Sequence, residues 1–364
     1  MTRSLTGTKA STAAWPNCWS ECQAARQSST FNCTVRLPPE ALSDGAIHLP
    51  SLGTAVLPGT TGLAGTTGLP GTTGLPGATM RHHEGVTEIA GRHGRLVLPQ
   101  ALDTDAPGWR GLLRVSVADG ARPLRLVIDD ADPHRFPSSL RPAARLSPAL
   151  RRQWRRRITG GWRVLADGHP RAATDVATVI RSVVPLAAPD GDMRSVTTRR
   201  VFGSIGLSLP SDDVQMALTL AHEVQHAKLA ALMDLVPLVA EDATGVYYAP
   251  WRPDPRPLPS LLQGLYAHVE VARFWRQQRA AALDAADAWH ANVEFAKWRN
   301  ACSLVADSVR GHPALTSCGT AFVDGMADAL RRWQNDSIPA GESAQAEREI
   351  NKHKREWDSL HGVP

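Results

Sequence analysis

The chain has 364 residues, more than one average domain needs, and 43% of them are hydrophobic, so two units with sizeable cores are expected. Its net charge of +5 and pI of about 9.2 are only mildly basic, and an odd number of cysteines, five, argues against a disulfide scaffold and favours thiols in a reducing cytoplasm. With no signal peptide and no run of about 18 apolar residues, we expect a cytoplasmic protein without a membrane partner.

The first third of the chain is predicted to be rich in β-structure. Residues 1–35 are expected to form a disordered tail, and residues 36–135 a β-rich N-terminal region. The strand-like apolar runs of this region include 96–98, 112–117 and 124–128. A Gly-Thr-Thr-Gly-Leu-Pro repeat at 59–77 is too rich in glycine to build a core of its own, so we expect a flexible surface insertion and assign it no function.

A helix predicted over about 147–167 carries a dense run of arginines around Trp154. The run consists of Arg151, Arg152, Arg155, Arg156 and Arg157. It could bind nucleic acid or an anionic peptide, but a solvated helix face with Trp154 and Ile158 packed inward is the favoured interpretation. Because no recognition helix, zinc-finger spacing or RNA-binding signature accompanies the run, we expect no nucleic-acid partner.

Two further elements precede the most informative motif. A helix is predicted over 172–184, and a strand over 201–209, where apolar residues alternate with Gly and Ser. The strand leads directly into the motif helix. It is either a plain sheet strand or an exposed edge that pairs with an extended peptide, and the sequence leaves both open.

The motif is His222-Glu223-Val224-Gln225-His226, on a helix predicted over 214–236 with Ser211 as its N-cap. Histidines four residues apart lie on the same helix face and can bind one metal ion, while Glu223 can reach the open coordination position. Both histidines belong to a stripe that we expect to face the interior. The stripe consists of Leu218, His222, His226, Leu229 and Met233.

A third protein ligand is needed, and the long zinc-protease signature does not supply it. The sixth residue after His226, where that signature has a histidine, is Leu232. The nearest suitable side chains are Glu241, Glu270 and His268. We predict His268, which lies on the apolar face of a helix expected over 260–298; a buried structural histidine is the alternative.

A stiff loop with four prolines at 251–259 precedes that helix and holds Arg252 and Arg256 in fixed places. These arginines fit a ligand carboxylate, or else they cap carbonyls or pair with Asp254. Further helix is predicted at 319–335, followed by a charged helix or tail at 341–364.

The chemistry of such a site depends on its metal. With Zn²⁺, Glu223 would act as the general base of a metallopeptidase. With Fe²⁺, three protein ligands leave three positions for a 2-oxoacid and O₂, and the 2-oxoacid needs a fixed cation for its distal carboxylate. The two arginines could provide that cation.

A longer composite pattern resembles the HExxH family of peptide-modifying proteins, which occur in ribosomal-peptide biosynthetic clusters, often beside or fused to radical SAM enzymes. The segments that carry the resemblance are 128–133, 199–203, 221–229, 232–238, 248–258 and 262–268. The match covers about residues 110–300, and the repeat, which departs from the family pattern, lies outside it.

The resemblance implies an Fe(II)- and 2-oxoglutarate-dependent peptide β-hydroxylase. His222 and His226 match the metal ligands, and His268 matches a histidine after the family's Gly-x-Tyr-Ala. The arginine loop matches too, without indicating whether Arg252 or Arg256 holds 2-oxoglutarate. The implied partners are a ribosomal precursor peptide and a radical SAM maturase of the same cluster.

We therefore predict an α+β protein with the β-rich region followed by a mostly helical, zincin-like catalytic domain at 140–340. The precursor peptide would bind in extended form near the 201–209 strand. Glu223 would orient substrate or steady a ligand instead of deprotonating water. A zinc metallopeptidase and a non-catalytic module that binds leader peptides remain the alternatives.

Overall fold

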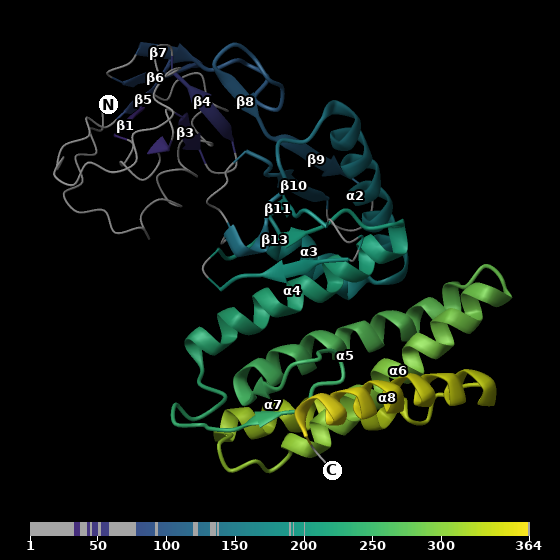
Figure 1. Cartoon of the computed structure of the whole chain (residues 1–364). Coiled ribbons are helices and arrows are strands. Elements are labelled where there is room, and N and C mark those ends of the chain that lie inside the picture. The colour runs from purple at the N-terminus through teal and green to yellow at the C-terminus, as the bar shows by residue number, and fades with distance from the viewer. Residues whose placement is uncertain are drawn as a thin grey trace. The chain divides into compact units, whose positions relative to one another are not determined.

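The computed structural model describes residues 33–36, 42–43, 46–49, 52–57, 78–91, 94–118, 123–131, 136, 138–188, 191, 193–199 and 201–362. The repeat at 59–77 and most of the tail predicted at 1–35 lie outside the described residues, although Cys33–Arg36 forms strand β1. The protein is α+β, with its sheets in the N-terminal half and most of its helices in the C-terminal half (Figure 1). It divides into two compact units, Met1–Arg114 with Val127–Ser138 and Val115–Leu126 with Ser139–Pro364.

The first unit contains two four-stranded antiparallel sheets, in the orders β1-β5-β6-β7 and β2-β3-β4-β8. Their strands are β1 (Cys33–Arg36), β2 (Leu42–Ser43), β3 (Ala46–Leu49), β4 (Gly53–Val56), β5 (Thr79–His83), β6 (Val86–Gly91), β7 (Gly94–Val97) and β8 (Trp109–Gly111). Glu84 and Gly85 both have positive φ, as the tight turn between β5 and β6 requires. Residues of both sheets, including Ile47 and Ile89, share one buried core.

The second unit is built on a five-stranded mixed sheet in the order β12-β13-β11-β10-β9. Its strands are β9 (Leu113–Val117), β10 (Leu124–Ile128), β11 (Ser182–Pro185), β12 (Ser195–Thr197) and β13 (Ser204–Leu207). The strand predicted at 201–209 is β13. It is fully buried and is paired with β11 on one side and β12 on the other, so the suggestion that it offers an exposed edge is wrong. The edge strand beside it is β12.

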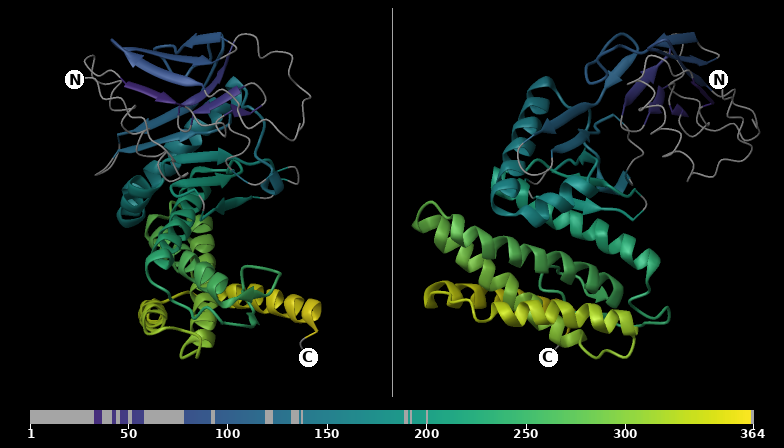
Figure 2. Two further views of the ribbon diagram at one scale, coloured as in Figure 1. Left: turned by 90° about the vertical axis from the view of Figure 1, so that its left-hand side faces the viewer. Right: turned by 180° about the vertical axis from the view of Figure 1, so that it is seen from behind.

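Seven α-helices lie in the described part of the second unit (Figure 2). They are α2 (Pro148–Gly168), α3 (Pro170–Val179), α4 (Asp213–Leu235), α5 (Leu258–Ala281), α6 (Ala285–Val309), α7 (Ser317–Trp333) and α8 (Ala340–His361). The short 3-10 turn η3 (Ser138–Leu140) precedes α2, and the short strands β14 (Val246–Tyr247) and β15 (Arg256–Pro257) pair before α5. None of the described helices is long and apolar enough to cross a membrane.

Three predicted boundaries differ from the structure for local reasons. The helix predicted over 172–184 ends at Val179, because the β-branched residues that follow form the buried strand β11. The helix predicted over 260–298 is two helices, since Asp284 caps α6 by accepting a hydrogen bond from Asp287 N at 2.8 Å. The N-cap of α4 is Asp212, not Ser211; its carboxylate accepts from Gln215 N at 2.7 Å.

The arginine run of α2 is a solvated helix face, as favoured from the sequence. Trp154 and Ile158 are buried, whereas Arg152, Arg155 and Arg156 are exposed. Because α4 packs against α2, α3 and α5, the motif helix is supported from several sides.

Candidate metal centre

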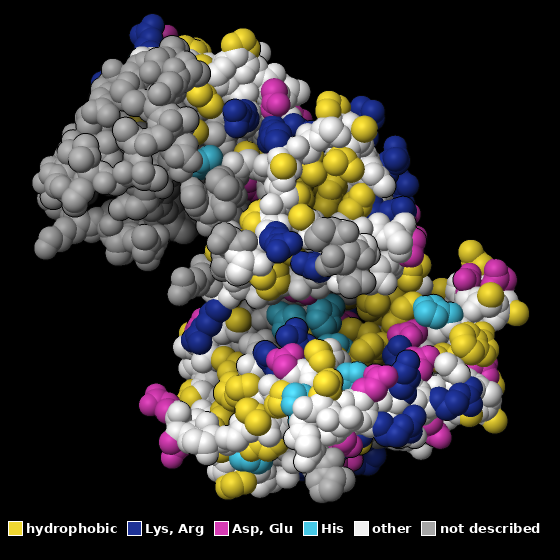
Figure 3. Space-filling model, in the orientation of Figure 1, with side chains coloured by type: hydrophobic (Ala, Val, Ile, Leu, Met, Phe, Trp, Pro, Cys, Tyr) yellow, Lys and Arg dark blue, Asp and Glu magenta, His cyan; other side chains and the backbone are white. Residues whose placement is uncertain are grey.

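His222 and His226 lie on the side of α4 that faces α5. The buried side of α4 is formed by Met216, Ala217, Leu220, Ala221 and Val224, among others. His222, His226 and Met233 are half-buried, and His222 keeps 19% of its side chain exposed. Of the predicted stripe, Leu229 is buried and the other four members are half-buried against α5, so the expected inward orientation is confirmed in part. In Figure 3, histidine side chains are visible together in a hollow between α4 and α5.

The two motif histidines have the separation of two ligands to one ion. Their Nε2 atoms are 3.1 Å apart, and their ring centres are 4.8 Å apart. Two imidazole nitrogens each about 2.0–2.1 Å from one metal, at an angle of 90–109°, are roughly 2.9–3.4 Å apart, with ring centres roughly 4.5–5.2 Å apart. Both observed distances fall in these ranges.

The structure brings His268 to the same place from α5. Its ring centre is 4.9 Å from that of His222, again a separation that suits one shared ion. Its Nδ1–H donates to the Gly264 carbonyl oxygen at 2.8 Å, which leaves Nε2 as the lone-pair nitrogen. His226 makes a longer contact of the same kind, between Nδ1 and Gln263 Oε1 at 3.4 Å. Such outer hydrogen bonds select the tautomer that a metal ligand needs.

The three rings have separations that suit a shared metal ion, but their nitrogens do not converge on one position. Within the described part of the chain, no group of three or more His, Cys, Asp or Glu side chains has the geometry to hold a metal ion as it stands. The ring separations fit, but three nitrogens must also point at one position. Rotation of an imidazole about its broad χ2 torsion changes where its nitrogen points while leaving the ring in place. Three imidazoles are donor types that suit a divalent metal, but in the described residues they are not yet arranged as a metal site.

Burial keeps His222 and His268 in the neutral form that a metal requires. Removal from water, together with the nearby His268 and His226, holds the pKa of His222 well below its ordinary value. Burial lowers the pKa of His268 to about 3, although the hydrogen bond to Gly264 opposes this shift. A metal ion therefore displaces no proton from these two rings at neutral pH.

Glu223 is almost fully buried, at 1% exposure, and is held by the edge strand β12. Thr197 Oγ1 donates to Glu223 Oε2 at 2.6 Å and lies 3.2 Å from the Glu223 carbonyl oxygen. The other carboxylate oxygen, Oε1, is 4.0 Å from His222 Nε2. One oxygen of Glu223 is thus fixed to the sheet and the other is next to the first motif histidine.

Arg252 and Arg256 share one carboxylate. Arg252 Nε donates to Asp254 Oδ1 at 2.9 Å, and Arg256 Nη1 donates to Asp254 Oδ2 at 3.0 Å. Burial opposes ionisation, but the hydrogen bonds from Arg252 and Arg256 together hold the pKa of Asp254 below its usual range. Of the two roles considered from the sequence, the structure shows the pairing with Asp254. The loop reaches the cluster through Trp251, whose indole stacks on His268.

The other candidate ligands are placed elsewhere. Glu270 is buried and pairs with Arg273 at 3.2 Å; burial raises the pKa of its carboxyl, and Arg273 opposes that change. Glu241 is exposed. The sequence-based interpretation did not single out Thr197, Gln263 or Trp251. Gly264 and Trp251 lay within the family-like segments, but neighbours along the chain say nothing about which ring an indole will cover.

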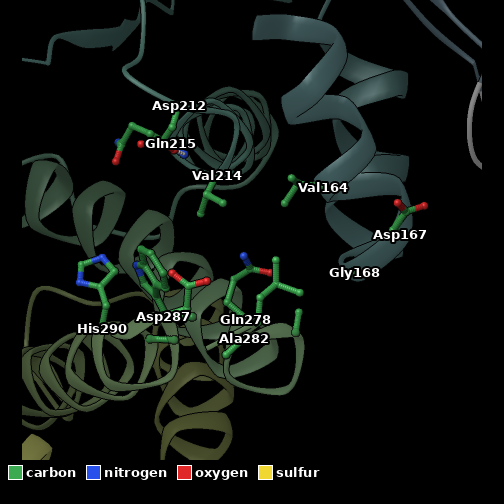
Figure 4. Close-up of a pocket in the computed structure, with 14 residues that line it drawn as sticks. Val164, Asp167, Gly168, Asp212, Val214, Gln215, Gln278, Ala282, Asp287 and His290 are labelled. Carbon is green, nitrogen blue, oxygen red and sulfur yellow. Dashed lines mark hydrogen bonds between the residues drawn. The ribbon is translucent and has the colours of Figure 1, made fainter. Parts of the chain in front are cut away.

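A cavity of about 680 Å³ lies between the start of α4, the end of α5 and parts of α2 and α6 (Figure 4). Gln215 lies seven residues before His222, and Trp275 lies seven residues after His268, so both are two helical turns, roughly 10 Å, from the cluster. The cavity is lined by Asp167, Asp212, Gln278, Asp287 and His290 among others. A smaller one of about 180 Å³, with Arg199, Met233 and Gln263 in its lining, lies toward the opposite end of α4.

No family model matches the chain, and no curated protein matches it.

Proposed function

We propose that the protein is an Fe(II)- and 2-oxoglutarate-dependent β-hydroxylase of a ribosomally made precursor peptide. The observation that carries the proposal is the triple histidine cluster of His222, His226 and His268, which is joined through Trp251 to a loop with two arginines. The resemblance of the same segments to peptide-modifying HExxH proteins adds to it.

The three imidazoles would hold the metal, and no other protein donor is required. Fe(II) bound by three such ligands keeps positions for 2-oxoglutarate and O₂, and supplies the oxidising power to replace a C–H bond with C–OH. The overall reaction is balanced: peptide, O₂ and 2-oxoglutarate give hydroxylated peptide, succinate and CO₂. The chain's own contribution would be three imidazole nitrogens, arginine for the distal carboxylate, and a cleft that excludes part of the solvent.

The peptide would lie along β12. This strand pairs with β13 and, in the described part of the chain, with no other strand, so its second side is available for an extended peptide. Thr197 at its end contacts Glu223, and β12 contacts α4. A peptide added to this edge would pass close to the histidines, with the two cavities beside α4 ready to take flanking side chains.

Glu223 supports a second candidate, a zinc peptidase. Its Oε1 is 4.0 Å from His222 Nε2, so a metal-bound water could be within its reach. Under the hydroxylase proposal the same carboxylate joins β12 to α4 through Thr197 and orients the peptide. Replacement of Glu223 by Gln therefore separates the two: it abolishes peptide cleavage, whereas it leaves part of the hydroxylation.

The test is metal analysis after anaerobic purification, followed by incubation with the precursor peptide encoded beside the gene. The proposal expects a mass gain of about 16 Da, roughly one oxygen atom as this class of iron site inserts, with succinate release that requires both iron and 2-oxoglutarate. His222→Ala should lose both, and His83→Ala, which removes an exposed imidazole from the first unit, should lose neither. Tightly bound zinc with a cut peptide would establish the peptidase. Failure to bind any metal, with leader peptide still bound, would leave the non-catalytic module.

A further inference from the structure

We propose that Trp251 is a positioning residue that fixes the ring of His268 and thereby sets the affinity of the three-histidine centre for a divalent metal. The inference rests on the metal centre of the proposed function, but it holds whether the bound metal serves oxygenation or hydrolysis.

The indole of Trp251 covers one face of the imidazole of His268. The two ring centres are 4.4 Å apart and the planes are inclined by only 12°, a stacked pair. A second indole, that of Trp298 on α6, contacts the same imidazole with ring centres 4.8 Å apart and planes at 40°. Contact with two indoles restricts rotation of the His268 imidazole about χ2, the torsion that turns its plane.

Gly264 makes this stack possible. A Cβ at Gly264 would lie 2.4 Å from Trp251 Nε1 and 2.7 Å from Cε2, so any other residue there would push the indole away. The carbonyl oxygen of Gly264 also accepts the Nδ1–H of His268 at 2.8 Å. One turn of α5 thus sets the imidazole in two ways, through its tautomer and through the plane of its ring.

The position of Trp251 is itself held from the C-terminal helix. Tyr248 Oη and His353 Nδ1 of α8 form a hydrogen bond of 2.9 Å, and His361 Nε2 donates to the Pro253 carbonyl oxygen at 2.7 Å. Contacts on both sides of Trp251 therefore tie its loop to α8. The indole is presented by a supported loop and does not need the metal to order it.

Loss of the stack should weaken metal binding without removing a ligand. Changes in the groups that orient a metal-bound histidine typically lower metal affinity 10–100-fold. We expect Trp251→Leu to weaken Co²⁺ binding at least about tenfold, and Trp251→Phe, which keeps a flat ring, to retain most of the affinity. The Co²⁺ absorption spectrum should change in Trp251→Leu, because the field around the ion depends on how the third imidazole is oriented.

The decisive experiment is a double-mutant cycle on the full chain. Gly264→Ala displaces the indole while leaving it in the chain, and alanine is a better helix former than glycine, so α5 itself is not weakened. We expect Gly264→Ala to weaken Co²⁺ binding as Trp251→Leu does, and the double variant to be no weaker than either, because both remove the same contact. Trp289→Leu, which removes a half-exposed indole from α6, is the matched control and should bind Co²⁺ as the original chain does.

Two results would overturn the inference. One is an unchanged Co²⁺ affinity and spectrum in Trp251→Leu; the other is additive losses in the double variant. Far-ultraviolet circular dichroism of each variant identifies any that fail to fold. In that case the Co²⁺ affinity and spectrum are measured on Trp251→Phe, provided that its fold is intact. If the Trp251 variants behave as expected and no hydroxylation is detected, the positioning role stands and the proposed reaction fails. If hydroxylation is detected and Trp251→Leu binds Co²⁺ as the original chain does, the proposed reaction stands and the positioning role fails.

Discussion

Asp254 is the residue whose replacement tests the arginine loop most directly. As the structure stands, its carboxylate occupies both Arg252 and Arg256, each through a hydrogen bond of about 3 Å. A ligand carboxylate would need the same guanidinium groups. Asp254 is therefore a competitor built into the loop, and Asp254→Asn removes its charge while keeping its size.

The expected effect follows from the exposure of the three side chains. Arg252, Arg256 and Asp254 keep 52%, 32% and 43% of their side-chain surface exposed, so each pair is worth on the order of 0.2–1 kcal/mol after screening by solvent. Removing about 0.5–1 kcal/mol of competition should tighten binding of 2-oxoglutarate about two- to fivefold, since 1.4 kcal/mol corresponds to a factor of ten. The free energy of unfolding should fall by no more than about 1 kcal/mol.

The assay is isothermal titration of the Co²⁺-loaded protein with 2-oxoglutarate under nitrogen, with Asp254→Asn compared with the original chain. Arg252→Leu and Arg256→Leu, each combined with Asp254→Asn, leave a single arginine in the loop. Comparison of these two variants also shows which arginine holds the ligand. Weaker binding in Asp254→Asn would mean that the carboxylate pre-orients the arginines and does not compete. Unchanged binding in all variants would refute the assignment of a carboxylate site to this loop.

Three further predictions concern the strand contact, pH and packing. Thr197→Val leaves the buried carboxylate of Glu223 without its 2.6 Å donor, so it should lower turnover and cost roughly 1–3 kcal/mol of stability. Thr197→Ser keeps the hydroxyl and should keep both turnover and stability. Turnover and urea unfolding measure the two effects, and equal values in the two variants would contradict the prediction. Burial lowers the pKa of His169, opposed by its hydrogen bonds to the side-chain oxygens of Gln278 and Gln277, so the unfolded chain takes up a proton near pH 6.5 that the folded chain does not. The free energy of unfolding should therefore fall as pH drops below about 6.5, and His169→Gln should reduce that slope; an unchanged slope would argue against it. In α7, Gly319→Ala would place Cβ within 2 Å of a backbone carbonyl oxygen and should cost roughly 1–3 kcal/mol in urea unfolding, whereas Gly325→Ala, with nothing within 4 Å, should be neutral or stabilising; equal stabilities would contradict this.

The fold class and most elements of the second unit were predictable because they depend on local patterns. The arginine face of α2, the motif helix α4 and the charged helix α8 all have periodicities or caps that reveal them. The failures came where a short apolar run fits two structures. The residues of β11 have the β-branched composition of a strand, yet they also continue the apolar pattern of α3, and only their pairing with β13 decides between the two.

The site was predictable in its residue types but not in its contacts. His222 and His226 are four residues apart on one helix, so their proximity follows from helix geometry alone. His268 is 42 residues beyond His226, and its approach depends on the packing of α5 against α4. The same is true of Thr197, which reaches Glu223 because β12 lies against α4. Sequence patterns of period two or 3.6 contain no information on such distant pairs.

The two chemistries share the same three imidazoles, so what separates them is the surroundings of the histidines. A peptidase needs Glu223 free to move a proton between water and the leaving amine. Here Thr197 donates a hydrogen bond to Glu223 Oε2 at 2.6 Å, which restrains the movement of the carboxylate. An oxygenase needs instead a cation near the metal for the second carboxylate of its co-substrate, and the loop that carries Trp251 also carries Arg252. Glu223→Gln and Asp254→Asn therefore form a discriminating pair. Loss of activity in the first with no effect in the second is the peptidase pattern. Partly retained hydroxylation in the first with tighter 2-oxoglutarate binding in the second is the oxygenase pattern.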